Sequence, residues 1–150
     1  MSNQPLKMTM KIPCSAEFVG IVRLAISGAA SRMNYSIEEI EDIKISVSEA
    51  CTNAIQHAYG DHPNTETDSI DINVNMYDTK LEIIIQDYGK GFDTSLLGTE
   101  EQKRKSHEKM GLGLGLTFIK SLMDETTLSS ELGKGTTLRI AKTAPQQIIA

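Results

Sequence analysis

The stretch SEACTNAIQHAYG, residues 48–60, contains the pattern on which the prediction of the fold depends. Glu49, Asn53 and His57 recur at intervals of four residues, so in an α-helix their side chains lie one above another on a single face. Asn is a mediocre helix former, because its side chain competes for the hydrogen bonds of the backbone. Taken alone, this row of an acid, an amide and an imidazole is explained by a solvated helix face, and only its surroundings can make it a candidate site.

The helix that carries the row has a clear beginning and a regular apolar stripe. Ser36 followed by Glu39 matches a capping box, which predicts a helix from about Ile37 to about Tyr59. Apolar residues at steps of three and four form its core-facing stripe: Ile37, Ile40, Ile43, Val47, Ala50, Ala54 and Ala58. The polar row lies on the flank of this stripe, so it borders the core without filling it.

The segments on either side of this helix predict further strands and a second helix. Residues 6–12 alternate apolar and polar side chains, which predicts a half-buried strand. Ser15 is positioned to cap a helix that reaches about Arg32. Residues 69–77 and 79–89 predict two strands joined by a tight turn.

The C-terminal half predicts a lid, a short helix and a second hairpin. The stretch at about 92–112 is rich in glycine and charge, and irregular loops of this length are usually lids or binding loops. A short amphipathic helix is expected at 114–125, a closing hairpin at 126–142 and a frayed tail at about 143–150. We therefore expect a single domain, 1–150, that folds as a two-layer α/β sandwich with a mixed sheet.

The composition excludes several classes of protein. With 39% hydrophobic and 23% charged residues, the chain is typical of a soluble globular domain, and its net charge of −5 argues against direct nucleic-acid binding. Cys14 and Cys51 are too few for a disulfide framework and are expected to be buried thiols in a reducing compartment. Neither a signal peptide nor an apolar run of membrane-spanning length is present, so we expect a cytoplasmic protein without a membrane segment.

Two of the residues in the polar row suit a particular chemistry. The carboxylate of Glu49 can act as a general base. The amide oxygen of Asn53 is a hard ligand of the kind that Mg²⁺ prefers, and Mg²⁺ takes few protein ligands beside substrate phosphates. A zinc site made by Glu49 and His57 is a weaker alternative, because the HExxH order of zinc proteases is absent.

Two glycine-bearing motifs follow. In DYGKGF, a strand delivers Asp87 to the end of the sheet, and Gly89 and Gly91 permit close approach of the backbone, although a simple turn explains the same residues. In MGLGLGL, residues 110–116, three alternating glycines lead into a helix whose first N–H groups can bind an anion. A dinucleotide-binding motif is rejected, because no strand precedes these glycines, and GKGTT at 133–137 is a hairpin turn that lacks the residues of a P-loop.

Together, the order and spacing of these pieces resemble the ATP-binding signature of the GHKL superfamily, which includes DNA gyrase, Hsp90, sensor histidine kinases and MutL. The resemblance covers residues 36–141 and rests on four motifs: Glu49-x-x-x-Asn53, Asp87-x-Gly89-x-Gly91, Gly111-x-Gly113-x-Gly115 and Gly135-Thr136-Thr137. It implies a Bergerat-type fold, in which ATP lies between helices and sheet beneath a mobile lid. The short length and VSEACTNAIQHAY are similar to the small bacterial anti-sigma factors that are also serine kinases, the RsbW and SpoIIAB type.

The resemblance implies a role for each motif. Glu49 would act as the base on a serine hydroxyl, and Asn53 would hold Mg²⁺ against the triphosphate of ATP. Asp87 would bind the adenine amine, supported through water by Thr137, and Gly89 and Gly91 would let the base approach. The phosphates of ATP or ADP would be bound by the loop of Gly111, Leu112, Gly113, Leu114 and Gly115, and by Lys109 of the lid.

The resemblance also implies partners. These are a stress-response sigma factor, a STAS-type anti-anti-sigma protein that carries the target serine, and a second copy of the chain in a homodimer that pairs through the N-terminal strand. Arg23 on the first helix would contact the protein partners. Two alternatives stay open: a non-catalytic ATP-binding anti-sigma module, and an isolated histidine-kinase catalytic domain.

Overall fold

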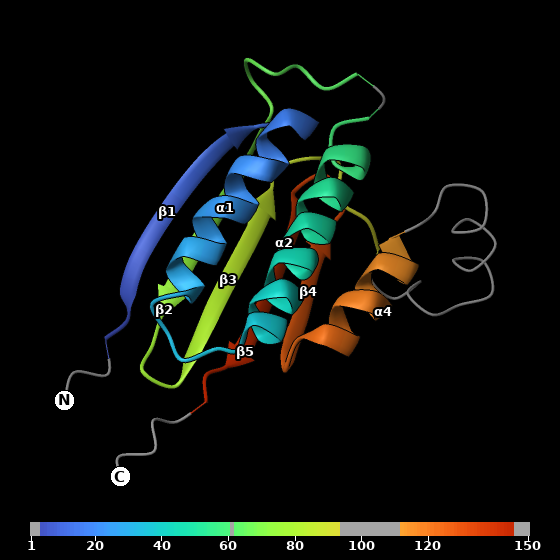
Figure 1. Cartoon of the computed structure of the whole chain (residues 1–150). Helices are drawn as coiled ribbons and strands as arrows, with labels where there is room; N and C mark the ends of the chain where they lie inside the picture. Colours follow the sequence, from blue (N-terminus) through green and yellow to red (C-terminus); the bar gives the residue numbers. More distant parts are fainter. Residues whose placement is uncertain (1–3, 61, 94–111, 146–150) are drawn as a thin grey trace, which may run out of the picture.

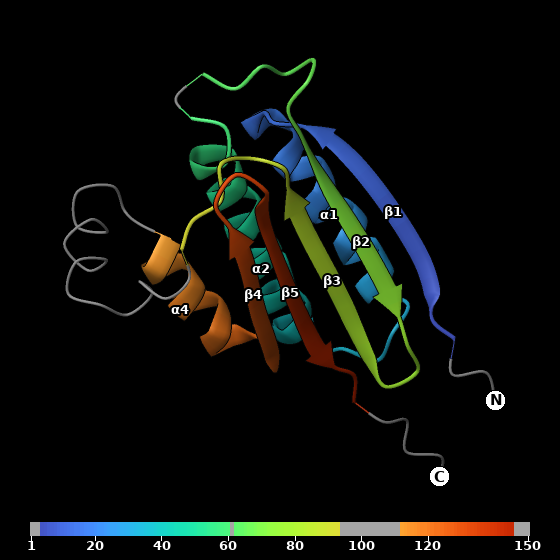
Figure 2. The same ribbon diagram turned by 180° about the vertical axis from the view of Figure 1, so that it is seen from behind.

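The chain folds into one sheet covered on one face by helices. Figure 1 shows the computed structural model, which describes residues 4–60, 62–93 and 112–145. The elements are β1 (Leu6–Pro13), a 3₁₀ turn (Ala16–Phe18), α1 (Val19–Ala30), α2 (Ile37–His57), β2 (Ser69–Met76), β3 (Lys80–Asp87), α4 (Leu112–Leu122), β4 (Glu125–Glu131) and β5 (Gly135–Thr143). In Figures 1 and 2, α1, α2 and α4 lie on the same face of the sheet, which confirms the predicted two-layer α/β sandwich. No helix among the described residues has both the length and the apolar character needed to cross a membrane.

The strand order is β1-β2-β3-β5-β4, and all four pairings in the described residues are antiparallel. This corrects the expectation of a mixed sheet. The connection through α4 does bring β4 back in the same direction as β3, as a parallel crossover would. However, the hairpin after β4 inserts β5 between the two, so their parallel edges never meet. Gly133 and Gly135, with φ of 80° and 99°, make the turn of that hairpin possible.

The predicted capping box begins α2. The Ser36 hydroxyl accepts a hydrogen bond from Glu39 N at 3.1 Å, and the Glu39 carboxylate accepts one from Ser36 N at 3.0 Å. The helix ends at His57, two residues before the expected Tyr59. Ile37 is 83% exposed, so its expected place in the core is wrong.

The N-terminal and C-terminal segments also differ from expectation. The helix expected from Ser15 is divided into a 3₁₀ turn and α1, and the Ser15 side chain makes no capping hydrogen bond. The frayed tail was expected from residue 143, but Thr143 still belongs to β5, so that boundary is wrong. Ala144 is buried and its N–H donates to Thr79 O at 2.8 Å, while residues 146–150 lie outside the described part.

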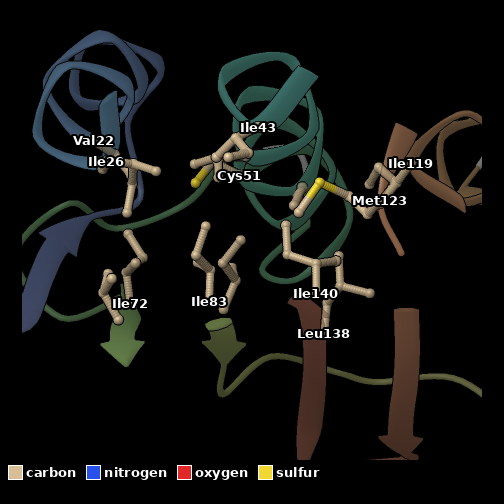
Figure 3. Packing of buried hydrophobic residues seen from close by; sticks show 14 of the residues in the cluster. Val22, Ile26, Ile43, Cys51, Ile72, Ile83, Ile119, Met123, Leu138 and Ile140 are labelled. Carbon is tan, nitrogen blue, oxygen red and sulfur yellow. The ribbon is translucent and has the colours of Figure 1, made fainter. Parts of the chain in front are cut away.

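The core lies between the helices and the sheet. Figure 3 shows the side chains of Val22 and Ile26 from α1, Ile43 and Cys51 from α2, Ile119 from α4 and Met123 just after it, above Ile72, Ile83, Leu138 and Ile140 of the sheet. The buried apolar area holds the helices over the strands, because removal of such area from water is the main favourable contribution to folding. This packing sets the spacing between α2 and α4, and the candidate site lies between these two helices and the sheet.

Candidate functional site

A pocket opens between α2, α4 and one end of the sheet. Asn53 and His57 of α2 line one wall, Asp87 and Thr136 line the sheet side, and Phe92 lies at its edge. Its empty space is about 550 Å³ when the open solvent at its mouth is included. The remaining lining is mainly apolar, so the pocket combines an apolar slot with a few polar groups at defined places.

Asp87 is the buried polar group on the sheet side. It is the last residue of β3 and is 5% exposed, and its Oδ1 accepts hydrogen bonds from Gly89 N at 3.0 Å and from Thr136 N at 3.2 Å. Burial raises the pKa of this carboxyl group, and the two backbone N–H donors partly oppose that effect. Both donors bind Oδ1, so Oδ2 is the oxygen through which a ligand amine can be bound.

The glycines after Asp87 are required by close packing. A methyl group at Gly89 would lie 2.0 Å from the carbonyl oxygen of Ala58, at the end of α2. Gly91 has φ of 62°, and a methyl group there would lie 2.0 Å from Glu131 O. The Lys90 backbone also donates to Ala58 O at 2.8 Å. The loop therefore passes between the end of α2 and the β4–β5 hairpin, a space that admits no side chain.

Glu49 and Asn53 meet α4 at Gly115. Asn53 is 7% exposed, and a methyl group at Gly115 would lie 2.6 Å from Asn53 Nδ2 and 2.7 Å from Glu49 Oε1. The glycine thus lets the first turns of α4 rest directly on the acid and the amide. Any larger residue would force the ends of the Asn53 and Glu49 side chains to shift.

The predicted glycine loop is partly helical. Because α4 begins at Leu112, Gly113 and Gly115 belong to the beginning of the helix, and the expected helix start at residue 114 is two residues late. Leu112 and Leu114 lie on the same first turn. Gly111 and Lys109, with residues 94–111 of the expected lid, lie outside the described residues.

Thr136 takes the place beside Asp87 that the sequence assigned to Thr137. Asp87 pairs with Thr136 across β3 and β5, and alternation from the core residue Leu138 puts Thr136 on the pocket face. Thr137 lies on the opposite face of the sheet. In the sequence, alternation counted back from the apolar Leu138 is the signal that places Thr136, and not Thr137, on the pocket face of β5.

His57 and Phe92 also line the pocket, and the sequence assigned no role to either. The four-residue spacing that linked His57 to Asn53 was sufficient to place it on this wall. Phe92 is held at the edge by a hydrogen bond from its N–H to the Ser130 hydroxyl at 2.9 Å. No local pattern links Phe92 to Ser130, because the contact joins a loop to strand β4, far apart in the sequence.

Glu49 also borders a groove on the outer side of the helices. This groove lies between α1 and α2, and Arg23, Leu24, Ile45 and Ser48 contribute to its lining. Arg23 and Leu24 are exposed. Glu49 therefore stands between the groove and Gly115 of α4, where a group that enters from outside can reach it.

The oxygen atoms at the site suit a metal ion that binds together with a phosphate-bearing substrate. Among the described residues, no cluster of three or more His, Cys, Asp or Glu can hold a metal ion. The amide oxygen of Asn53 fits Mg²⁺, which commonly takes one or two protein oxygens and completes its coordination with water and substrate phosphates.

Comparisons with known proteins agree with this geometry. The family described as "Histidine kinase-like ATPase domain" matches residues 12–142. The serine-protein kinase RsbW of Bacillus subtilis is 42% identical over 137 residues, covering 89% of this chain and 84% of that protein. RsbW of Halalkalibacterium halodurans is 38% identical over 135 residues, covering 87% and 80%, and RsbW of Staphylococcus epidermidis is 41% identical over 128 residues, covering 83% and 79%.

A solved structure has the same fold. The RsbU and RsbW domains of a Mycobacterium tuberculosis protein match with a TM-score of 0.66 and 16% identity, covering 97% of this chain. The chain spans 34% of that solved chain, and the likeness shows the fold alone.

Gly115→Ala is expected to separate stability from nucleotide binding. Ala is favoured over Gly inside a helix by about 1 kcal/mol, which opposes the strain of the new contact, so the melting temperature should change little. The methyl group should displace the side-chain ends of Asn53 and Glu49 and weaken Mg–ATP binding, measured by calorimetry, by at least about tenfold. Gly28→Ala in α1 is the matched control, because a methyl group there meets nothing within 4 Å. Wild-type affinity in Gly115→Ala would show that the close approach is not needed.

Asp87→Asn is expected to change how stability depends on pH. Because the folded protein holds the Asp87 proton more tightly than the unfolded chain does, wild-type stability falls as pH rises through the raised pKa. Asn keeps the acceptor oxygen and removes this charge, so the variant should be more stable at neutral pH, and its advantage should shrink as pH falls. Urea unfolding at a series of pH values measures this, with exposed Asp78→Asn as control. A difference that stays constant with pH would contradict the account.

Proposed function

Because the chain belongs to the RsbW family of serine-protein kinases, we propose that it is an ATP-dependent serine kinase that is also an anti-sigma factor. It binds and inhibits a stress-response sigma factor, and it phosphorylates a serine of a STAS-type anti-anti-sigma protein. The observation that carries the proposal is the meeting of a carboxylate, Glu49, and an amide, Asn53, against the beginning of α4. This is the arrangement that a phosphoryl-transfer site needs: a base, a metal ligand and backbone N–H groups for phosphate.

The pocket is proposed to bind ATP or ADP. The adenine ring would lie against the apolar residues Ile85 and Leu138 of the sheet, with its amine on the buried Asp87 carboxylate. Support for this orientation comes from the fixed Oδ1 of Asp87, which leaves Oδ2 for the donor. The triphosphate then extends toward Asn53 and the N-terminus of α4, where helix N–H groups favour anions.

Asn53 is proposed to hold Mg²⁺ together with the phosphates. When bound, Mg²⁺ neutralises the negative charge of the triphosphate and of the phosphoryl group in transfer. The near-complete burial of Asn53 supports this role, because a fixed amide oxygen orients a metal better than an exposed one. Glu49, four residues earlier on the same face, remains available for proton transfer.

Glu49 is proposed to accept the proton of the serine hydroxyl. The serine oxygen forms a bond to the γ-phosphorus while the bond to the bridging oxygen of ADP breaks, and the hydroxyl proton passes to the Glu49 carboxylate. Positioning and neutralisation of charge supply the larger part of catalysis in such transfers. The groove beside Glu49 supports entry of the serine from the outer side of the helices.

Partner surfaces are proposed on two sides of the molecule. Arg23, exposed at the groove, would contact the protein partners, and its position near Glu49 supports a role in delivery of the serine. Strand β1, which lies at the edge of the sheet that the described residues form, would join a second copy in a homodimer. We also propose a cytoplasmic location, where the thiols of Cys14 and Cys51 stay reduced, and no direct binding of nucleic acid.

Two alternatives lead to different products. A non-catalytic ATP-binding module would bind nucleotide and sigma factor without phosphate transfer. An isolated histidine-kinase domain would place acid-labile phosphate on its partner, whereas a serine kinase forms an acid-stable ester. The presence of Glu49 beside Asn53 favours the kinase, because a module that only binds nucleotide has no use for a base there.

Glu49→Gln is expected to abolish transfer without loss of nucleotide binding. Gln keeps the shape of the side chain but cannot accept the proton, so transfer of labelled phosphate from ATP to a STAS partner should fall by roughly 10²–10⁴-fold. ADP affinity, measured by calorimetry, should stay within about twofold of the wild-type value, since one unit of charge is lost away from the adenine. Exposed Glu38→Gln is the control.

Three results would contradict the proposal. Retained transfer by Glu49→Gln would remove the role of the base. Acid-labile phosphate on the partner would support the histidine-kinase alternative. No transfer by the wild-type protein to any candidate partner would support the non-catalytic module.

A further inference from the structure

Lys142 is a buried cation outside the proposed chemistry. It is the next-to-last residue of β5 and is 8% exposed, and alternation with Leu138 and Ile140 turns its side chain toward the helices. Its Nζ donates a hydrogen bond to Leu122 O at 2.6 Å and lies 3.7 Å from Asp42 Oδ2. One side chain of the sheet thus joins the end of α4 to the first half of α2.

The contact acts on the C-terminal end of α4. Leu122 is the last residue of that helix, and the last carbonyls of a helix lack partners within it, so a cation there is favourable. The turn that follows is held separately, since Asp124 N donates to Ala141 O at 3.0 Å and Thr143 N donates to Asp124 Oδ2 at 2.7 Å. The turn can serve as a pivot, and Lys142 restrains the helix above it.

The other end of α4 has little tolerance for movement. Gly115 lies against Asn53 and Glu49 with no room for a methyl group. From Gly115 to Leu122 the helix rises about 10 Å, so a tilt of about 10° at the lower end moves Gly115 by about 2 Å. A displacement of even ~1 Å in a positioned group can cost on the order of 10² in rate.

We propose that Lys142 is a positioning residue for phosphate transfer. Its ammonium, held between the Leu122 carbonyl and the Asp42 carboxylate, fixes α4 against α2 and thereby sets Gly115 on the Glu49–Asn53 pair. Lys142 does not line the pocket, and it acts on the reaction only through α4. The inference rests on the proposed roles of Glu49 and Asn53.

Lys142→Met removes the charge and the donor but keeps an unbranched side chain. Removal of one partner of a buried ion pair is usually destabilising, but the cost is limited here because the Asp42 side chain is 28% exposed and its charge stays hydrated. We expect a melting temperature at or slightly below that of wild type, ADP affinity within about twofold of wild type, and a kcat for serine phosphorylation lower by at least about tenfold. Lys142→Arg, which keeps the donor, should recover the larger part of kcat. Lys120→Met, an exposed position on α4, is the control.

The proposal is overturned if Lys142→Met keeps the wild-type kcat. It is equally overturned if kcat, ADP affinity and melting temperature fall together, or if Lys142→Arg is as impaired as the Met variant, because a purely structural role predicts those outcomes. Amide hydrogen exchange gives a readout that needs no partner: exchange in α4 should be faster in Lys142→Met, with β1 and β2 unchanged. Unchanged exchange in α4 refutes the restraint, whereas absence of transfer by the wild-type protein refutes the proposed function.

Discussion

The contact of Gly115 with Glu49 and Asn53 is the constraint on which the arrangement of the site depends. It requires that α2 stay helical through both residues, that α4 begin before Gly115, and that the sheet hold the two helices at one separation. The core below them meets the last condition, since Ile119 of α4 and the adjacent Met123 belong to the same core cluster as Ile43 and Cys51 of α2. The close approach of α4 to α2 at Gly115, which has no side chain of its own to pack there, is thus maintained by the hydrophobic core beneath the two helices.

The helix α2 serves the core and the site at once. Its buried residues include Val47, Ala50 and Cys51. Asn53 is buried beside them, because its side chain leaves the helix only a fraction of a turn away from theirs. At its C-terminal end, Ala58 receives the backbone of the Asp87–Gly91 loop. The group proposed to bind adenine and the group proposed to bind Mg²⁺ are therefore positioned against the same helix, and a shift of α2 would move both.

The sequence predicted those features that depend on local patterns. The capping box at Ser36 located the start of α2, alternation located the strands, and the spacing of acid, amide and glycines identified the family. What it missed depends on contacts between distant segments. The insertion of β5 between β3 and β4 made the sheet antiparallel, and Thr136 rather than Thr137 faces Asp87 because of that register. The start of α4 at Leu112 runs against the low helix propensity of Gly113 and Gly115, which the packing on α2 overrides.

The central claim is that Asn53 and Asp87 hold the two ends of one nucleotide. The most direct test is a crystal structure of the protein with Mg²⁺ and a non-hydrolysable ATP analogue. The account predicts that the Asn53 side-chain oxygen coordinates Mg²⁺ at about 2.1 Å and that the Asp87 carboxylate accepts a hydrogen bond from the adenine amine at about 2.9 Å. A nucleotide bound outside the α2–α4 pocket, or Mg²⁺ coordinated without Asn53, would contradict it.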